Sequence, residues 1–380
     1  MAVPVPRGDA VLLTPPDRDE AAFLLRGFVS AATGAGGLTE IQRLLFEAVS
    51  RAMTGHRVNP AAAEPIDAES FARGLARRNL AFRSRIVQIM VLGELVLSPI
   101  PTEVSVRVAE FADQLGVSED LINVGRSFAE GSLGMAAIDF ERNGYLDGAA
   151  MGRSTHTSVA LTHAWEAVPD DRALAARWAS LADLDPGTIG RGVHDFYRSR
   201  GFVFPGLPGS APPLLAQHDW VHVLADYGST VESEIEVFGF IARANDDPRA
   251  FSLLAMVVSL FETGYLATGA GLFEADRGHL SRSGMTTRLA DAMRRGALCA
   301  GSTDFLAMDW FALADRPVEV LRAELVLPAK AGAAVRAGSV GPWQPGGMSP
   351  FQRAAGQRLA EQQSAPTYLS APDQRTPTSE

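Results

Sequence analysis

The segment QHDWVHVLADYGSTVESEIE, residues 217–236, contains two histidines and an aspartate within five positions, followed by three glutamates. If a helix follows Pro213, then His218, Asp219 and His222 lie at about 0°, 100° and 40° on its wheel and share one face. Imidazole nitrogens and carboxylate oxygens are ligands of Zn²⁺ and other first-row ions. This spacing therefore predicts a metal site. The alternative is the polar edge of an ordinary helix.

A second helix is predicted after Gly228, and its apolar stripe contains Glu234. A carboxylate on a buried face is costly unless it is paired or binds a metal. A turn at Gly228 can fold the second helix back toward the first, so that Glu234 reaches the histidines. The predicted ligands of one divalent ion are therefore His218, Asp219, His222 and Glu234. The alternative for Glu234 is a buried salt bridge to an arginine.

The two neighbouring glutamates are predicted to have other roles. Ser229 and Glu232 have the spacing of a capping box, in which the glutamate returns a hydrogen bond to the first residue of the helix. Glu236 falls outside the apolar stripe and is expected to face solvent. Neither residue is expected to bind the metal.

The donor set favours Zn²⁺ as the cofactor, and Fe, Mn and Mg are compatible with it. No GxGxxG follows a predicted strand, so the sequence indicates no flavin or nicotinamide site. Catalytic residues beyond the metal ligands are not predicted.

The elements that must position these ligands are predicted to be helices, because apolar residues recur at helical spacing almost throughout from about residue 17. Asp17 and Asp19 precede the first such run as a candidate capped start. The expected fold class is all-α, with two helical domains followed by a disordered C-terminal tail. The expected boundaries are 15–142 and 155–330 for the domains, 143–158 for a linker, and 331–380 for the tail, which is rich in Gly, Pro, Ala, Ser and Gln.

Composition narrows the class of protein. The net charge of −10 argues against a nucleic-acid partner. The single Cys299 and the absence of a signal-peptide pattern predict a reducing, cytoplasmic location. The apolar run 250–273 has Glu262 at its middle, so a buried helix is expected there rather than a membrane span.

Three segments resemble the Coq4 family of coenzyme Q biosynthesis proteins over residues ~160–328. The first segment is the HDxxH motif, followed by eleven residues and a glutamate. Two positions depart from the family pattern: Val193 stands where an aromatic residue is usual, and Ser233 where glycine is usual. The second segment is residues 181–197, where Pro186, Thr188 and Gly190 match the family pattern. The third is residues 292–325, where the matching positions are Arg295-Gly296, Asp309-Trp310, Pro317 and Arg322.

The N-terminal half resembles the TerB-like helical fold of tellurite-resistance proteins. Its Thr-Glu pairs at 39–40 and 102–103 open two similar amphipathic segments, which suggests an internal duplication. TerB-type loops carry several acidic metal ligands, but the corresponding loops here have one carboxylate each. We therefore expect a helical interaction module without a metal.

The Coq4 resemblance implies decarboxylation and hydroxylation at C1 of a prenylated hydroxybenzoate-type lipid. It also implies quinone-biosynthesis enzymes as partners, and peripheral association with the inner face of a bacterial membrane. A homo-oligomer is compatible with this function. Two alternatives stay open: a non-catalytic lipid-binding scaffold with a structural metal, and a metal-dependent hydrolase acting on a substrate such as a prenyl phosphate.

Overall fold

The computed structural model describes residues 16–97, 100–118, 122–123, 170–208, 210–211, 213–244, 248–263, 278–299 and 303–362. Within these residues every regular element is an α-helix or a short 3-10 helix, and there is no strand. The predicted all-α class is confirmed. The linker predicted at 143–158, the second half of the apolar run at 250–273 and the last part of the predicted tail lie outside the described residues.

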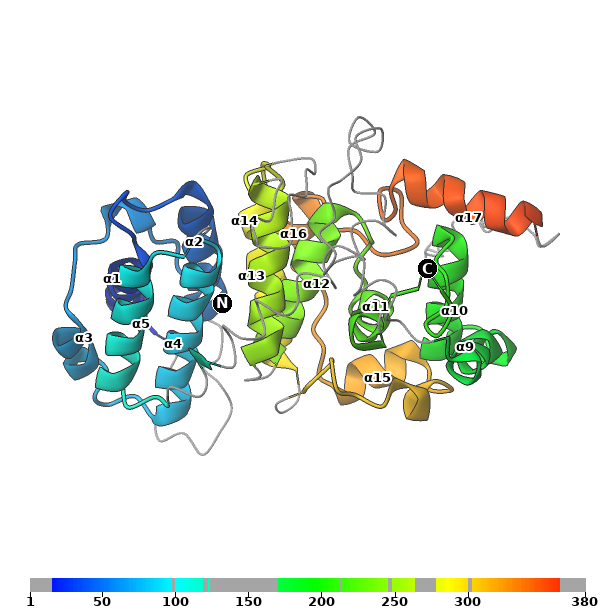
Figure 1. The fold of residues 1–380 in the computed structure, drawn as a ribbon, viewed down its shortest axis with the longest axis horizontal. Coiled ribbons are helices and arrows are strands. Elements are labelled where there is room, and N and C mark those ends of the chain that lie inside the picture. The colour runs from blue at the N-terminus through cyan, green and yellow to red at the C-terminus, as the bar shows by residue number, and fades with distance from the viewer. Residues whose placement is uncertain are drawn as a thin grey trace, which may run out of the picture.

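The N-terminal half is a bundle of helices whose starts follow the capping signals of the sequence (Figure 1). The Asp17 side chain accepts a hydrogen bond from the Glu20 N–H at 2.8 Å, as the sequence predicted. Thr39 forms a capping box with Gln42 at the next helix start. These caps satisfy backbone N–H groups that the first helical turn leaves without partners. The helices are α1 (Arg18–Ala32), α2 (Glu40–Thr54), α3 (Ala68–Gly74), α4 (Leu80–Leu95) and α5 (Thr102–Gln114).

Three helices form a central layer between this bundle and the rest of the chain (Figure 1). They are α12 (Val231–Ala244), α13 (Pro248–Thr263) and α14 (Met285–Leu298). The layer contacts the N-terminal bundle, since α13 packs on α4 and α14 packs on α2. One contact is a hydrogen bond of 2.8 Å from Arg51 to the Thr287 hydroxyl. The two predicted domains thus share a packed boundary.

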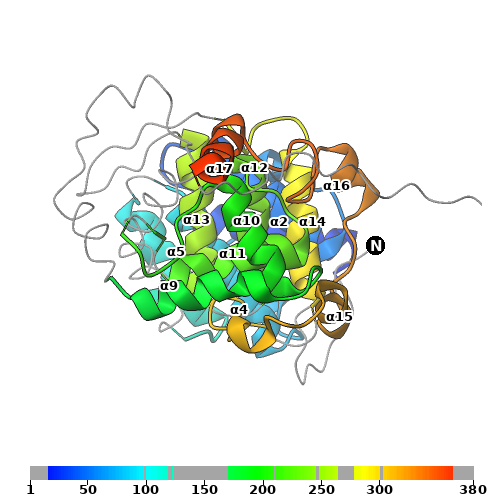
Figure 2. The same ribbon diagram turned by 90° about the vertical axis from the view of Figure 1, so that its right-hand side faces the viewer.

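Most of the remaining helices lie beyond this layer, with α11 packed on α12, and Figure 2 views the molecule from that side. Two of them, α10 and α11, carry the side chains of the candidate site and of its surroundings. The outer helices are α9 (Arg172–Ala179), α10 (Ile189–Arg200), α11 (Pro213–Ala225), α15 (Val318–Glu324), α16 (Gly332–Arg336) and α17 (Pro350–Gln362).

The predicted boundary of the disordered tail is wrong. Residues 332–336 and 350–362 are helical, and α17 packs against α10. The helices approach closely because Gly356 has no Cβ; a Cβ there would lie 2.0 Å from the Ser199 carbonyl oxygen. The small-residue composition that suggested disorder is therefore what allows this contact.

Gly296 explains how α14 can lie directly against α12. A Cβ at this position would lie 2.1 Å from the backbone carbonyl oxygen of Phe240, which cannot rotate away. Gly296→Ala should therefore lower the free energy of unfolding by about 2 kcal/mol, as overpacking usually does. Gly36→Ala is the matched control, because a Cβ at Gly36 would meet no atom within 4 Å. Chemical denaturation of the two variants measures the difference, and equal stabilities would contradict this packing.

None of the helices in the described part of the chain is both long enough and apolar enough to span a bilayer.

Candidate metal centre

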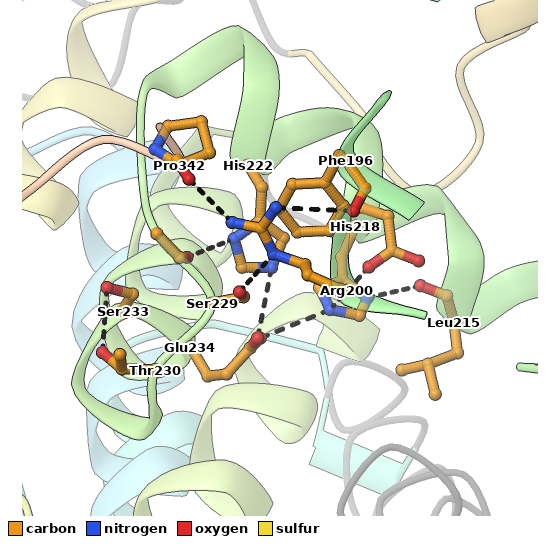
Figure 3. Close-up of polar contacts among 12 residues, drawn as sticks. Phe196, Arg200, Leu215, His218, His222, Ser229, Thr230, Ser233, Glu234 and Pro342 are labelled. Carbon is orange, nitrogen blue, oxygen red and sulfur yellow. Dashed lines mark hydrogen bonds and ion pairs between the residues drawn. The ribbon is translucent and has the colours of Figure 1, made fainter. Parts of the chain in front are cut away.

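Helices α11 and α12 bring the four predicted ligands together. The chain leaves α11 after Ala225, turns at Gly228 and enters α12 at Val231, so that the second helix folds back beside the first. Glu234 then lies opposite the two histidines (Figure 3). His218, Asp219, His222 and Glu234 are each at most 1% exposed.

The distances within this group fit a single ion. His218 Nε2 lies 3.3 Å from Glu234 Oε2 and 3.6 Å from Asp219 Oδ1, and His222 Nε2 lies 3.3 Å from Glu234 Oε1. Ligands held at 2.0–2.1 Å around a tetrahedral Zn²⁺ are separated by about 3.3–3.4 Å. Ligand atoms of His218, Asp219 and His222 also lie within 4.8 Å of one another. The spacing is therefore compatible with coordination of one ion.

Backbone carbonyls set the tautomer of both histidines. His218 Nδ1 hydrogen-bonds the carbonyl oxygen of Leu215, and His222 Nδ1 lies 2.6 Å from that of Gly228. A carbonyl can only accept, so Nδ1 carries the proton in each ring and Nε2 presents a lone pair when the ring is neutral. Metal-binding histidines usually have this arrangement.

The donor set fits a divalent cation. With neutral rings, two Nε2 lone pairs face carboxylate oxygens, and such acceptors repel one another unless a proton or a cation lies between them. With both carboxylates ionised, a divalent ion would neutralise their charge of −2 in a site that water does not reach. His218, Asp219, His222 and Glu234 are thus the residues that would hold it.

The charge state of Glu234 agrees with a site built for cations. Burial raises the pKa of its carboxyl. When the two imidazoles carry a proton on Nε2 in place of a metal, charge interaction with His222 and hydrogen bonds from His218 and His222 outweigh burial. The net result is a pKa below the usual range of a glutamate, so the carboxylate is ionised.

Tyr197 orients the ligand Asp219, and no motif in the sequence pointed to this tyrosine. Its hydroxyl donates to Asp219 Oδ2 at 2.5 Å, which leaves Oδ1 on the side of His218. Tyr197 comes from α10, and its ring packs on Trp178 at 5.0 Å. Such supporting hydrogen bonds typically change metal affinity 10- to 100-fold.

A second support, also not predicted, lies behind His222. The Phe196 ring stacks on the imidazole of His222 at 5.1 Å, and the Arg200 guanidinium lies 3.8 Å from the centre of the Phe196 ring (Figure 3). Arg200 is 1% exposed and donates to the Ser229 hydroxyl at 2.5 Å and to the Pro342 carbonyl at 2.9 Å. The stack fixes the plane of the imidazole ring.

The segment before α17 holds the turn between α11 and α12. Gly228 N–H donates to the Val340 carbonyl at 2.9 Å, and Ser229 N–H donates to the Gly347 carbonyl at 2.8 Å. Gln352 donates to the Ser229 carbonyl at 2.7 Å. Since the Gly228 carbonyl binds His222, residues 340–352 support a metal ligand from outside the predicted domain.

The predicted roles of Glu232 and Glu236 are wrong. The Thr230 carbonyl accepts the first helical hydrogen bond, from Glu234 N–H at 2.9 Å, so α12 begins one residue later than a cap at Ser229 requires. Glu232 instead contacts His279 Nδ1 at 2.8 Å and forms an ion pair with Arg282.

Glu236 is 1% exposed and does not face solvent. Its Oε2 lies 2.6 Å from the Arg288 guanidinium of α14. The buried salt bridge considered for Glu234 thus exists two residues further along the chain.

Comparisons with known proteins give little further information. No family model and no curated protein matches this chain. A solved structure of a candidate ubiquinone biosynthesis protein from Nostoc punctiforme aligns with 65% of this chain and 98% of its own, at 18% identity and a TM-score of 0.30. A likeness at this level carries no argument about function. Membership of the Coq4 family therefore stays a prediction, as does the TerB-like fold of the N-terminal half.

Proposed function

We propose that this protein is a metal-dependent enzyme of quinone biosynthesis. The observation that supports the proposal is the convergence of His218, Asp219, His222 and Glu234, with both histidines presenting Nε2 to the carboxylates. The substrate class and the reaction are those that the resemblance to the Coq4 family implies. The proposed reaction removes the C1 carboxylate of a prenylated hydroxybenzoate-type lipid as CO₂ and hydroxylates the same carbon. O₂ is the two-electron oxidant and is reduced to H₂O₂, while water supplies the hydroxyl oxygen.

The metal, when bound, would supply Lewis acidity toward the carboxylate and phenol oxygens of the substrate. The chain supplies the rest. Tyr197 holds Asp219, and the Gly228 carbonyl holds the Nδ1 proton of His222, so these ligands need no rearrangement when an ion binds. Aromatic rings cover the imidazoles, with Phe238 4.9 Å from His218 and Phe196 5.1 Å from His222. They exclude water from the ligands.

The second candidate is a lipid-binding scaffold with a structural metal. The near-complete burial of all four ligands favours it, since closed sites with four protein ligands are usually structural. A cavity of about 340 Å³ also lies against α11, at positions roughly 150° around the helix from the histidines. It could bind the aromatic part of a lipid away from the metal. Its walls include Arg177, Trp178, Gln217, Trp220, Trp310 and Phe311.

Purified protein is expected to contain about one divalent metal ion per chain, with Zn²⁺ favoured. Removing it with a chelator should lower the melting temperature, because four buried acceptor groups then lose the cation they surround. Elemental analysis and thermal denaturation, with and without added Zn²⁺, measure both. The prediction fails if the protein holds no metal and added metal does not raise the melting temperature.

The coordination of the bound metal distinguishes the two candidate functions, the enzyme and the scaffold. Co²⁺ in place of the native ion gives absorption that reports coordination number, and Mn²⁺ gives water-proton relaxation that reports a bound exchangeable water. A coordination position with exchangeable water supports the enzyme, whereas a closed tetrahedral site supports the scaffold. Mass spectrometry of lipids that copurify tests the substrate class in either case. If no prenylated aromatic lipid copurifies with the protein from the native host, this result would count against both candidate functions.

A further inference from the structure

A second group of buried polar side chains lies on the other side of α12 from the metal ligands. Polar atoms without hydrogen bonds are rare inside proteins, and each needs a physical explanation. Five such atoms have no partner within 3.5 Å among the described residues: Tyr227 Oη, Glu236 Oε1, Arg288 Nε, Lys330 Nζ and Ser339 Oγ. Tyr227 and Lys330 have weaker interactions, with Arg295 and with Asp226, and the latter pair is separated by 3.6 Å.

These side chains converge from separate elements. Lys330 Nζ lies 4.9 Å from the centre of the Tyr227 ring, and the Arg295 guanidinium lies 4.9 Å from the same ring. Arg288 pairs with Glu236 at 2.6 Å. Glu236 in turn interacts electrostatically with both Tyr227 and Lys330. Two helices, the turn after α11 and the segment after α15 thus meet at one place.

Ser339 joins this group through its neighbour. A Cβ at Gly338 would lie 3.8 Å from Arg288 Nη1, so the chain at 338–339 passes directly beside that guanidinium. Ser339 is 2% exposed, and its hydroxyl adds one more donor without a partner.

The charges in this group are mainly positive. Three cations belong to this group: Arg288, which pairs with the buried Glu236 carboxylate, and Arg295 and Lys330, which lie against the Tyr227 ring. Arg295 also donates to the backbone carbonyls of Pro328 and Ala225, which carry no net charge. Asp226 lies 3.6 Å from Lys330, but its side chain is 42% exposed and water screens it.

One further carboxylate nearby, that of Asp291, already has its own partners. Asp291 pairs with Arg294 at 2.7 Å and accepts from the Ala331 N–H at 3.1 Å. It therefore compensates little of the charge on the other arginines and Lys330. An anion would both neutralise the surplus and accept from the unpaired donors.

The titration behaviour of two residues agrees with this surplus. Burial lowers the pKa of the Lys330 amine, and the carboxylates of Asp226 and Glu236 only partly oppose that effect. Burial raises the pKa of Tyr227 far above its usual range, so its hydroxyl keeps its proton and can donate. A bound anion would stabilise the charged form of Lys330.

We propose that these groups bind a small protonated oxyanion of the phosphate type. Lys330, Arg288 and Tyr227 donate to its oxygens, and Ser339 adds a hydroxyl. Glu236 Oε1 can only accept, so the ligand oxygen that meets it must carry a proton. Hydrogen phosphate has such a proton at neutral pH and sulfate does not, so the site should prefer phosphate. The proposal is independent of the function proposed for the metal centre.

Lys330 makes the test specific, because it is the only lysine in the chain. The full-length protein is treated with an amine-reactive reagent, and labelling of Lys330 is followed by peptide mass spectrometry with the N-terminal amine as internal reference. Inorganic phosphate should slow labelling of Lys330 relative to that reference and raise the melting temperature. Sodium chloride at equal ionic strength should do neither, and sulfate should act at concentrations at least about 10-fold higher.

Two variants complete the experiment. Lys330→Met should abolish the rise in melting temperature with phosphate, whereas Arg336→Met, which removes an exposed cation nearby, should retain it. Methyl phosphate acting like phosphate would indicate that a phosphomonoester headgroup also fits, whereas its failure would restrict the site to the free ion. The proposal is overturned if phosphate neither protects Lys330 nor raises the melting temperature, because water then satisfies these atoms. It is also overturned if the rise persists in Lys330→Met or if sulfate equals phosphate.

Discussion

Glu234→Gln is expected to weaken binding of a divalent metal at least about 10-fold, while Glu236→Gln leaves metal binding nearly unchanged and destabilises the fold. The difference arises because the two side chains lie on opposite sides of α12. Glu234 contacts His218 and His222 at 3.3 Å. Glu236 contacts Arg288 at 2.6 Å. Glutamine keeps the shape of either residue but removes its charge.

The stability effect of Glu236→Gln should be the larger of the two. It leaves the Arg288 guanidinium, 7% exposed, without its carboxylate, and breaking a buried pair from one side costs about 3 kcal/mol or more. Glu234→Gln should destabilise the metal-free protein less than Glu236→Gln does, because it removes a carboxylate that faces imidazole lone pairs.

Chelator competition and chemical denaturation of both variants measure the two effects. Glu319→Gln is the control: its side chain is 74% exposed and pairs with Arg322, so neither quantity should change measurably. If Glu236→Gln lost the metal and Glu234→Gln kept it, the assignment of the two faces of α12 would be reversed.

The sequence predicted Glu234 for a reason that also explains the error at Glu236. A helical wheel assumes one buried stripe and one solvated face. In α12 all residues but Glu232 are buried, because α11 covers one side while α13 and α14 cover the others. Glu234 is buried in both cases, whether the helix has one buried stripe or is covered on all sides. Glu236 could be placed only by knowing that α14 presents Arg288 on that side.

Local signals predicted the helices, the cap at Asp17 and the turn at Gly228, since each depends on neighbouring residues. The supports of the site depend on residues distant in sequence. Tyr197 reaches Asp219 across 22 positions, and Arg200 reaches Pro342 across 142. No spacing rule connects such pairs, so they could not be predicted from one sequence.

Composition misled at the C-terminus for a physical reason. Residues 331–362 bury few large apolar side chains, so the argument from hydrophobic burial predicted disorder. The segment is held instead by hydrogen bonds to backbone groups at Gly228 and Ser229 and by the close contact at Gly356. Interactions of this kind leave little trace in composition.

Gln352→Leu is expected to destabilise the protein by about 3 kcal/mol and to weaken metal binding several-fold, although Gln352 is not one of the proposed ligands. The Gln352 amide is 0% exposed; it donates to the Ser229 carbonyl at 2.7 Å and accepts from the Ser229 hydroxyl at 3.0 Å. Leucine has similar volume but leaves both Ser229 groups with fewer partners in a buried place. Each such loss costs about 1–3 kcal/mol.

The effect on the metal should follow from the position of Ser229. It adjoins Gly228, whose carbonyl fixes the Nδ1 proton of His222, so a looser turn lets the imidazole rotate away from the other ligands. Gln362→Leu makes the same substitution at the exposed end of α17 and should change neither stability nor affinity. Denaturation and chelator competition on both variants, with the NMR signals of His222 as a direct report, decide the matter. If Gln352→Leu lowered stability but left the metal affinity and the His222 signals unchanged, residues 340–352 would stabilise the fold without positioning the ligand.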